Sequence, residues 1–245
     1  MVDIFEEVEG QLRSDRYQTL ALRALPWVIG GLVLGLAIAL GVWAWTDHSR
    51  KVDAKASEAY ASAQEALQMG DADRAFTVFG EAAKAGSKGY EALALMRQAG
   101  IRLSQNKTDE AVALLDKAAD ASDSPLIADT ARLQAVYAMM DTGSAIEIEG
   151  RLKPLIAEAR PVRSHAREAL AMSRMAAGDS KEARAEFVLL SQGLETPQDV
   201  RERAAAAIGL IDSGMAASLP EVLKGAKTAP SLIPQSTLPQ AGTAQ

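Results

Sequence analysis

The hydrophobic pattern of the chain is dominated by one uninterrupted apolar run, from Ala24 to Thr46. Arg23 precedes this run, Asp47 follows it, and no ionisable side chain lies between them. As an α-helix that rises about 1.5 Å per residue, the run would cover about 33 Å, which exceeds the hydrocarbon thickness of about 30 Å in a typical bilayer. Lipid offers no hydrogen-bond partner to an open backbone, so a helix is the expected conformation there. The pattern predicts a single transmembrane helix over residues 24–46.

All three tryptophans stand near the ends of this run, at Trp27, Trp43 and Trp45, where interfacial aromatic residues are common. A secretory signal peptide is a poorer fit, because the preceding residues carry five acids against three arginines and the run is longer than a signal core. A buried core helix is also a poorer fit, since the rest of the chain is too polar to enclose it. Gly31 and Gly35 form a Gly-x-x-x-Gly pair through which two such helices could form a homodimer.

Residues 1–23 form a short head with helical periodicity. Asp3 can cap its start, and its apolar residues lie on one helical stripe, namely Ile4, Phe5, Val8 and Leu12. The head is either a solvated helix beside the membrane or a docking helix for a membrane partner. Lys and Arg are equally numerous on the two flanks of the span, so their charge does not orient it. The short head and the long C-terminal part favour a cytoplasmic N-terminus.

From Asp47 to about Ser213 the apolar positions follow a helical period that turn residues divide into short helices. The pattern Gly-Asp-x-x-x-Ala-x-x-x-Phe begins at Gly70 and again at Gly178, and an Asn-Lys version begins at Asn106. Gly178 follows Gly70 by 178 − 70 = 108 residues, three times the 106 − 70 = 36 residues between Gly70 and Asn106. Residues expected to pack the repeats together recur at this pitch: Ala63, Ala75, Phe79, Ala99, Ala111, Leu115, Ala135, Ala171, Ala183 and Phe187. The spacing predicts stacked antiparallel helix pairs.

The repeat over residues 56–197 resembles the tetratricopeptide repeat (TPR). The small residue of the first helix, the Gly or Asn turn, and the Ala and Phe or Leu of the second helix all match, although the pitch exceeds the family's usual length of about 34 residues. In the third unit Glu147 and Arg151 replace the Ala and Phe. That unit is either degenerate, or its second helix begins late with Leu152, Leu155 and Ile156 as its apolar face. The resemblance implies an all-α fold: the transmembrane helix, then a TPR-like α-solenoid over residues 47–213 that a helix at about 197–212 closes.

The order of parts resembles a narrower family. The head reads Asp-Ile-Phe-x-Glu-Val-x-x-x-Leu-Arg-x-Asp, and one span and TPR-like repeats follow, an arrangement similar to the bacterial YfgM-type proteins, which are ancillary subunits of the SecYEG translocon. This resemblance implies an inner-membrane protein whose TPR domain lies in the periplasm. It also implies an adaptor that works with the translocon and periplasmic chaperones on emerging client proteins. The alternative is a structural or regulatory scaffold for a cell-envelope complex.

The TPR resemblance also implies which residues face the inner groove, where TPR domains bind partners. These are Tyr60, Gln64, Met96, Leu103, Arg132, Val136, Met139, Glu168, Met172 and Met175. Methionine is concentrated in this set, and its flexible side chain suits a groove that accepts varied apolar segments. The same methionines could instead pack between the helices. The Lys/Asn/Arg set with which some TPR domains bind a C-terminal carboxylate is absent from these positions.

Composition and the absence of known motifs argue against several other functions. The formal net charge of −6 argues against nucleic acid as a partner, and the absence of cysteine excludes disulfides and thiolate metal sites. The two histidines, His48 and His165, lie far apart and do not have metal-ligand spacing. No phosphate-binding loop, nucleophile elbow or dinucleotide fingerprint occurs. We therefore expect a non-enzymatic protein with no metal and no cofactor.

The composition changes again from Gly214 to the end of the chain. Proline recurs there among Ser, Thr, Ala, Gln and Gly, which together bury too little apolar surface to offset the entropy of ordering. We expect residues 214–245 to form a disordered tail, in which a short amphipathic piece, Leu219–Leu223, could dock on the last helix.

Overall fold

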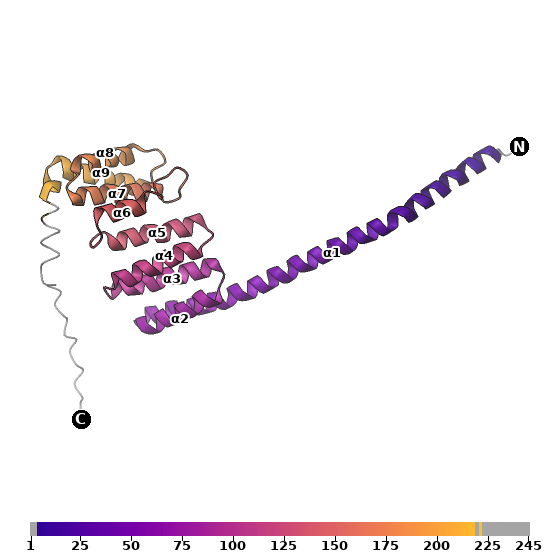
Figure 1. Cartoon of the computed structure of the whole chain (residues 1–245), viewed down its shortest axis with the longest axis horizontal. Coiled ribbons are helices and arrows are strands. Elements are labelled where there is room, and N and C mark those ends of the chain that lie inside the picture. Colours follow the sequence, from indigo (N-terminus) through magenta and orange to yellow (C-terminus); the bar gives the residue numbers. More distant parts are fainter. Residues whose placement is uncertain (1–3, 219–220, 222–245) are drawn as a thin grey trace, which may run out of the picture.

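The computed structural model describes residues 4–218 and residue 221 (Figure 1). Within these residues the chain forms nine α-helices and one short 3₁₀ helix, and it contains no strand. The elements are α1 (Ile4–Gln68), α2 (Ala72–Ala85), α3 (Lys88–Ser104), α4 (Thr108–Ala121), α5 (Pro125–Met139), α6 (Ala145–Leu152), α7 (Arg163–Ala177), α8 (Ser180–Gln192), α9 (Gln198–Asp212) and η1 (Met215–Ser218). Helices α2 to α9 stack in a solenoid, and α1 projects far beyond it (Figure 1). The predicted all-α solenoid with one long apolar N-terminal helix is confirmed.

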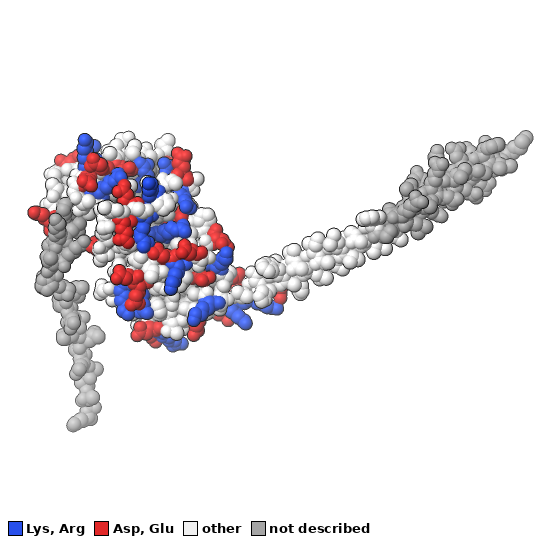
Figure 2. Space-filling view, viewed as in Figure 1, with Lys and Arg blue, Asp and Glu red and all other residues white. Residues whose placement is uncertain are grey.

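Helix α1 joins the predicted head, the predicted span and the first repeat helix in one continuous element. The apolar part is exposed, including Trp27, Trp43 and Trp45, and Figure 2 shows it as a stretch without charge beside the charged solenoid. Among the described residues this is the one helix long and apolar enough to cross a membrane, and none of its apolar window is buried in the protein. The helix does not break between Thr46 and Asp47, so the solenoid begins without a linker. The predicted cap Asp3 and the head's apolar side chains lie outside the described residues.

Three repeat turns share one backbone geometry. Gly70, Asn106 and Gly178 have positive φ angles of 81°, 59° and 96°, a conformation that Gly adopts freely and Asn tolerates. The next amide in each turn donates to the carbonyl five residues back, at 3.0 Å, 2.9 Å and 2.9 Å respectively. This is the Schellman closure of a helix C-terminus. After the first of these turns Asp71 caps α2 by accepting a hydrogen bond from the Arg74 amide at 3.0 Å. The repeat signature thus encodes the end of one helix and the start of the next.

The ten predicted repeat-packing residues are all buried, and none exposes more than 1% of its surface. Around Phe79 they form a core with the edge-to-face ring of Tyr60, whose centroid lies 5.1 Å away. Around Leu115 they form a core built largely from alanine, with Ala99, Ala111 and Ala135. Small side chains at these positions let neighbouring helices approach closely, so the solenoid needs few large residues to fill its interior.

Polar contacts join successive repeats at nearly the same pitch. Lys88 donates to Asp123 at 2.8 Å, and the two residues are 35 positions apart. The same separation of 35 recurs where Arg151 donates to Asp116 at 2.8 Å. It recurs again where Arg203 donates to a carboxylate on α7, Glu168, at 2.6 Å. These pairs therefore bridge neighbouring repeats at positions one residue short of equivalence.

The third unit departs from this pattern. Helix α6 begins on schedule at Ala145, after a Ser144 cap that accepts from the Glu147 amide at 3.2 Å, but it ends at Leu152. The alternative of a late start is therefore wrong: the second helix is short, and Leu155 lies beyond its end. The repeat would place a residue with positive φ at position 142 of this turn, but the residue there does not have a positive φ. Thr142 occupies that position, and a β-branched side chain disfavours the left-handed conformation.

The solenoid closes with α9 as predicted, and Pro197 stands immediately before its first residue. Beyond α9, the 3₁₀ helix η1 packs on it and buries Ala216. Residues 215–218 are therefore part of the folded domain, in contrast to the expectation that the tail begins at 214. The rest of the predicted tail, apart from Glu221, lies outside the described residues, as does most of Leu219–Leu223.

Candidate functional site

A cleft of about 290 Å³ opens between α3 and α5. Its lining residues are Met96, Ala99, Gly100, Leu103, Leu115, Gln134, Tyr137 and Ala138. Helix α3 supplies one wall at positions 96, 100 and 103, which a helical period places on one face. Helix α5 supplies the opposite wall, and the buried Ala99 and Leu115 close the floor. We call this feature the α3–α5 cleft.

The rim of the α3–α5 cleft is apolar and accessible. The Leu103 side chain is 38% exposed and Tyr137 is 42% exposed, although each also lines the cavity. Gly100 opens the α3 wall between them, since a Cβ added there would meet no heavy atom within 4 Å. A glycine in a helix interior destabilises the helix by about 1 kcal/mol relative to alanine, so this position adds space and not stability. The cleft can therefore admit a side chain or a backbone segment of a partner.

Tyr137 gives the cleft a polar group that stays neutral. Burial raises the pKa of Tyr137 above its ordinary value of 10.0, the nearby Glu168 carboxylate raises it further, and Arg203 acts in the opposite direction. The hydroxyl is therefore protonated at neutral pH and can donate or accept a hydrogen bond. Glu168 is itself buried and accepts hydrogen bonds from Arg203 at 2.6 Å and 2.8 Å. An ion pair between α7 and α9 thus influences the edge of the cleft.

Two of the ten residues predicted for the groove, Met96 and Leu103, line the α3–α5 cleft. Three others hold polar contacts elsewhere in the solenoid. Tyr60 accepts a hydrogen bond from Arg97 at 2.8 Å, and Arg132 pairs with the buried Asp129 at 3.2 Å. Glu168 is the third, through its pair with Arg203. The partner-binding role of these residues stays a prediction.

The remaining predicted groove residues are mostly apolar and pack against the interior. Val136 belongs to the core between α5 and α7, and Met139 is buried near the end of α5. Met172 and Met175 are partly buried against the core formed by α7, α8 and α9. Gln64 is half-buried on α1. At these methionines the packing alternative accounts for the contacts that the structure shows.

The sequence did not predict four lining residues, namely Gly100, Gln134, Tyr137 and Ala138. The repeat pitch of 36 residues identifies positions on α3 and α5 that are equivalent in their repeats. A cleft between two helices is lined by the sides that face each other, and those sides carry non-equivalent positions. Gly100 is the one of these four residues that the sequence could have indicated. A glycine inside a helix lowers the stability of the helix, so its presence suggests a packing or functional reason.

The chemistry of the cleft is that of a binding surface. Its walls are apolar, and its polar groups are an amide and a neutral hydroxyl, neither of which is paired with a catalytic base. Among residues 25, 27 and 29–218 no group of three His, Asp or Glu side chains is arranged to hold a metal ion. His165 lies 4.0 Å from Asp199, remote in the fold from His48 near the exposed part of α1. The cleft can therefore hold an apolar group.

Stacked helix pairs with an apolar cleft define a helical-repeat protein, a class whose members generally mediate protein–protein interaction. A family model described as a tetratricopeptide repeat-like domain matches residues 25–192, and the chain belongs to that family. The curated proteins include no match. A solved structure described as a crystal structure of a Podosopora anserina putative kinesin light chain, with nearly identical TPR-like repeats, is 17% identical. That alignment covers 70% of this chain and 93% of the other, with a TM-score of 0.49.

Proposed function

We propose that the protein is a membrane-anchored, non-enzymatic adaptor whose solenoid binds apolar segments of other proteins in the α3–α5 cleft. The observation that carries this proposal is the open apolar rim formed by Leu103 and Tyr137 over a formed cavity. A partner side chain placed there would remove apolar surface from water, which contributes about 25 cal/mol per Å². Gly100 leaves room for the partner's backbone.

The anchor is the exposed apolar part of α1. An exposed helix of this length and composition is unfavourable in water, and a bilayer would cover it. Because α1 continues without a break into the first repeat, the anchor would hold the solenoid at a defined distance and angle from the membrane. Tethering raises the local concentration of the cleft near membrane-bound partners. A homodimer through Gly31 and Gly35 is compatible with the open space around both glycines.

The resemblance to the YfgM type supports a more specific version. The head and span would bind the SecYEG translocon in the bacterial inner membrane, with the N-terminus in the cytoplasm. The solenoid would then lie in the periplasm and hold emerging client proteins or a periplasmic chaperone. The scaffold alternative differs in one respect, since a scaffold would bind a folded partner and would not accept unstructured apolar segments.

Photo-crosslinking in intact membranes tests the proposal. The probe replaces Leu103 at the cleft rim, and the matched control replaces Leu93, which lies on the same helix and has nearly the same exposure, 40% against 38%. We expect position 103 to capture many unfolded or newly made envelope proteins and position 93 to capture few of them. A second probe at Phe5 in the head is expected to capture translocon subunits.

Three results would count against the proposal. Equal capture at positions 103 and 93 would show that the cleft has no binding role. A single folded partner at position 103, with no translocon subunit from the head, would favour the scaffold. Deletion of residues 1–46 with the solenoid retained is expected to abolish recovery of membrane partners, and retained recovery would argue against the tether.

A further inference from the structure

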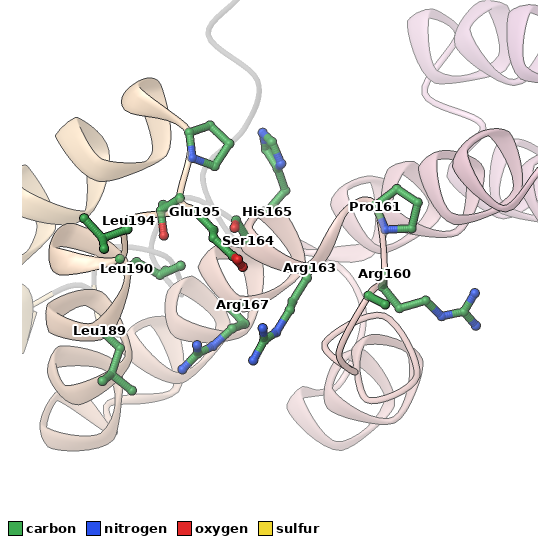
Figure 3. Close-up of a pocket in the computed structure, with 14 residues that line it drawn as sticks. Arg160, Pro161, Arg163, Ser164, His165, Arg167, Leu189, Leu190, Leu194 and Glu195 are labelled. Atoms are coloured by element: carbon green, nitrogen blue, oxygen red, sulfur yellow. The ribbon is translucent and has the colours of Figure 1, made fainter.

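A second cavity, of about 550 Å³, lies away from the α3–α5 cleft (Figure 3). It forms where the loop before α7 and the first turn of α7 meet the end of α8 and the α8–α9 loop. Its lining contains four basic side chains and one acidic side chain: Arg160, Arg163, His165 and Arg167, with Glu195. The cavity is therefore basic, although the chain as a whole has a formal net charge of −6. We call it the α7–α9 basic cavity.

Three of the four basic side chains already have acidic neighbours. Arg167 donates two hydrogen bonds to Glu186, at 2.7 Å and 3.0 Å, and Arg160 lies 3.3 Å from the buried Asp129. His165 lies 4.0 Å from Asp199. Figure 3 shows that Arg160 points away from the other labelled arginines, in keeping with its pair with Asp129 of α5. The acidic partners offset the charges of Arg160 and Arg167, so these groups serve the fold.

Arg163 is different. Its side chain has no hydrogen bond and no ion pair within the described part of the chain, and its Nε atom is buried. A buried N–H without a partner destabilises the state that contains it, and a guanidinium group favours bidentate pairing with a carboxylate. Arg163 and Arg167 extend to the same side in Figure 3, and Arg167 is already paired with Glu186, so Arg163 is the guanidinium left to bind a carboxylate. The cavity thus holds an unused anion-binding group.

The rim of the same cavity carries exposed leucines. Leu194 in the α8–α9 loop is 98% exposed, and Leu189 on α8 is also exposed, whereas Leu190 next to it is buried in the core. An unpaired arginine and two accessible leucines in the lining of one cavity suit a ligand that offers both a carboxylate and an apolar side chain. Free phosphate or a simple anion would use the arginine alone and would leave both leucines in water.

We propose that the α7–α9 basic cavity is a second docking site, which binds an acidic, leucine-rich peptide segment of a partner protein. A carboxylate of the segment pairs with Arg163, and an apolar side chain covers Leu189 and Leu194. The site goes beyond the α3–α5 cleft, which lacks a charged lining residue, and it selects for acidic segments where the cleft selects for apolar ones. Two separate sites would let one molecule hold a partner and a client together.

Fluorescence anisotropy with the full chain in phosphatidylcholine nanodiscs tests this proposal. The probe is a fluorescein-labelled dodecapeptide that alternates glutamate and leucine, and a glutamine/leucine peptide of the same length tests the charge. We expect Arg163→Glu to raise the Kd of the acidic peptide at least about tenfold, because a charge-assisted pair is lost and a like charge replaces it. Leu194→Ser is expected to raise the Kd about threefold, and the glutamine/leucine peptide is expected to bind weakly to the unmodified protein.

Controls separate this site from folding effects and from the α3–α5 cleft. Arg74→Glu changes an exposed arginine that lines neither the α3–α5 cleft nor the α7–α9 basic cavity, and it is expected to leave the Kd unchanged. Thermal unfolding shows whether Arg163→Glu is folded, while Leu194→Ser changes a side chain too exposed to affect folding. Leu103→Glu is expected to weaken capture at the cleft without changing the Kd of the acidic peptide.

Three results would overturn the proposal. An unchanged Kd for both Arg163→Glu and Leu194→Ser would remove the cavity as the binding site. A loss of acidic-peptide binding in Leu103→Glu would assign that peptide to the α3–α5 cleft. If Arg163→Glu instead abolishes co-sedimentation with phosphatidylglycerol vesicles and leaves the peptide Kd unchanged, the cavity recognises a lipid headgroup and not a peptide.

Discussion

Two kinds of packing alternate along the solenoid. The regular pairs, α1/α2, α3/α4 and α7/α8, place alanines such as Ala99 and Ala111 where neighbouring helices meet. The junction, which we define as α5, α6, residues 153–162 and the start of α7, is filled by large aliphatic residues. These are Leu133, Val136, Ile148, Leu152, Leu155, Val162 and Leu170. The regular pairs depend on close approach of helices, whereas the junction depends on the volume of its side chains.

The difference begins at the turns. Each regular pair has a left-handed Gly or Asn between its helices, and the short Schellman closure brings the second helix back against the first. At the junction Thr142 occupies the equivalent position, α6 ends after two turns, and an irregular segment completes the layer. Asp129 secures this segment from α5, because it is buried and pairs with Arg160 at 3.3 Å. The change of turn thus coincides with the change from a core rich in alanine to one rich in large aliphatic residues.

Removal of a large side chain from the junction is the test with the largest expected effect. Leu155 is completely buried, and Leu155→Ala is expected to lower the free energy of unfolding by about 2–5 kcal/mol, because a cavity replaces its contacts. Chemical denaturation of the detergent-solubilised chain, followed by circular dichroism, measures this change. The matched control is Leu126→Ala on α5, where the side chain is 57% exposed, with an expected change within about 0.5 kcal/mol. Equal effects for the two variants would show that the junction is not a packed core.

Enlargement of an alanine is the opposite test, and it addresses the regular pairs. Ala111 is completely buried between helices, so Ala111→Leu is expected to destabilise the chain by about 1–3 kcal/mol through overpacking. Ala113→Leu, two residues further along α4 at an exposed position, is the control and is expected to have almost no effect. The same denaturation measurement applies. If Ala111→Leu were as stable as Ala113→Leu, the helices at Ala111 would have room for a larger side chain and would not be in close contact.

The regular pairs were predictable from the sequence because their determinants are local. A left-handed residue at Gly70, Asn106 or Gly178 ends one helix, and small residues 36 positions apart mark each helix contact (for example 99 − 63 = 36). The early end of α6 has a different local signal, which the repeat pattern does not contain. Pro154 has no backbone N–H and disfavours the helical conformation in the residue before it, and α6 ends at Leu152.

The candidate site was predictable only in part. Met96 and Leu103 are among the groove positions that the TPR resemblance implies, and both line the α3–α5 cleft. Tyr137 lines it because of how α5 lies against α3, which is set by the alanines between them and not by any period within α5. Arg163 differs from the neighbouring arginines in having no acidic partner in the described part of the chain. The sequence shows only one arginine among several, so this difference is visible only in the structure. Sites built from the relation between helices need the structure.

Acid titration gives the smallest expected effect and separates surface ion pairs from both kinds of core. A side-chain hydrogen bond from Arg184, at 2.7 Å, holds the pKa of Asp212 below its ordinary value of 3.8. Because the folded pKa is the lower one, this pair stabilises the fold above pH 3.8, and that contribution is lost as the pH falls through the folded pKa. At pH 6 we expect Asp212→Asn to melt slightly below the unmodified chain, and we expect the difference in Tm to narrow as the pH falls below 3.8. Asp141→Asn, at an exposed position without an ion pair in the described part of the chain, is the control and is expected to show no difference at either pH. A Tm difference for Asp212→Asn that persists in acid would show that Asp212 acts through packing, as the residues of the junction do.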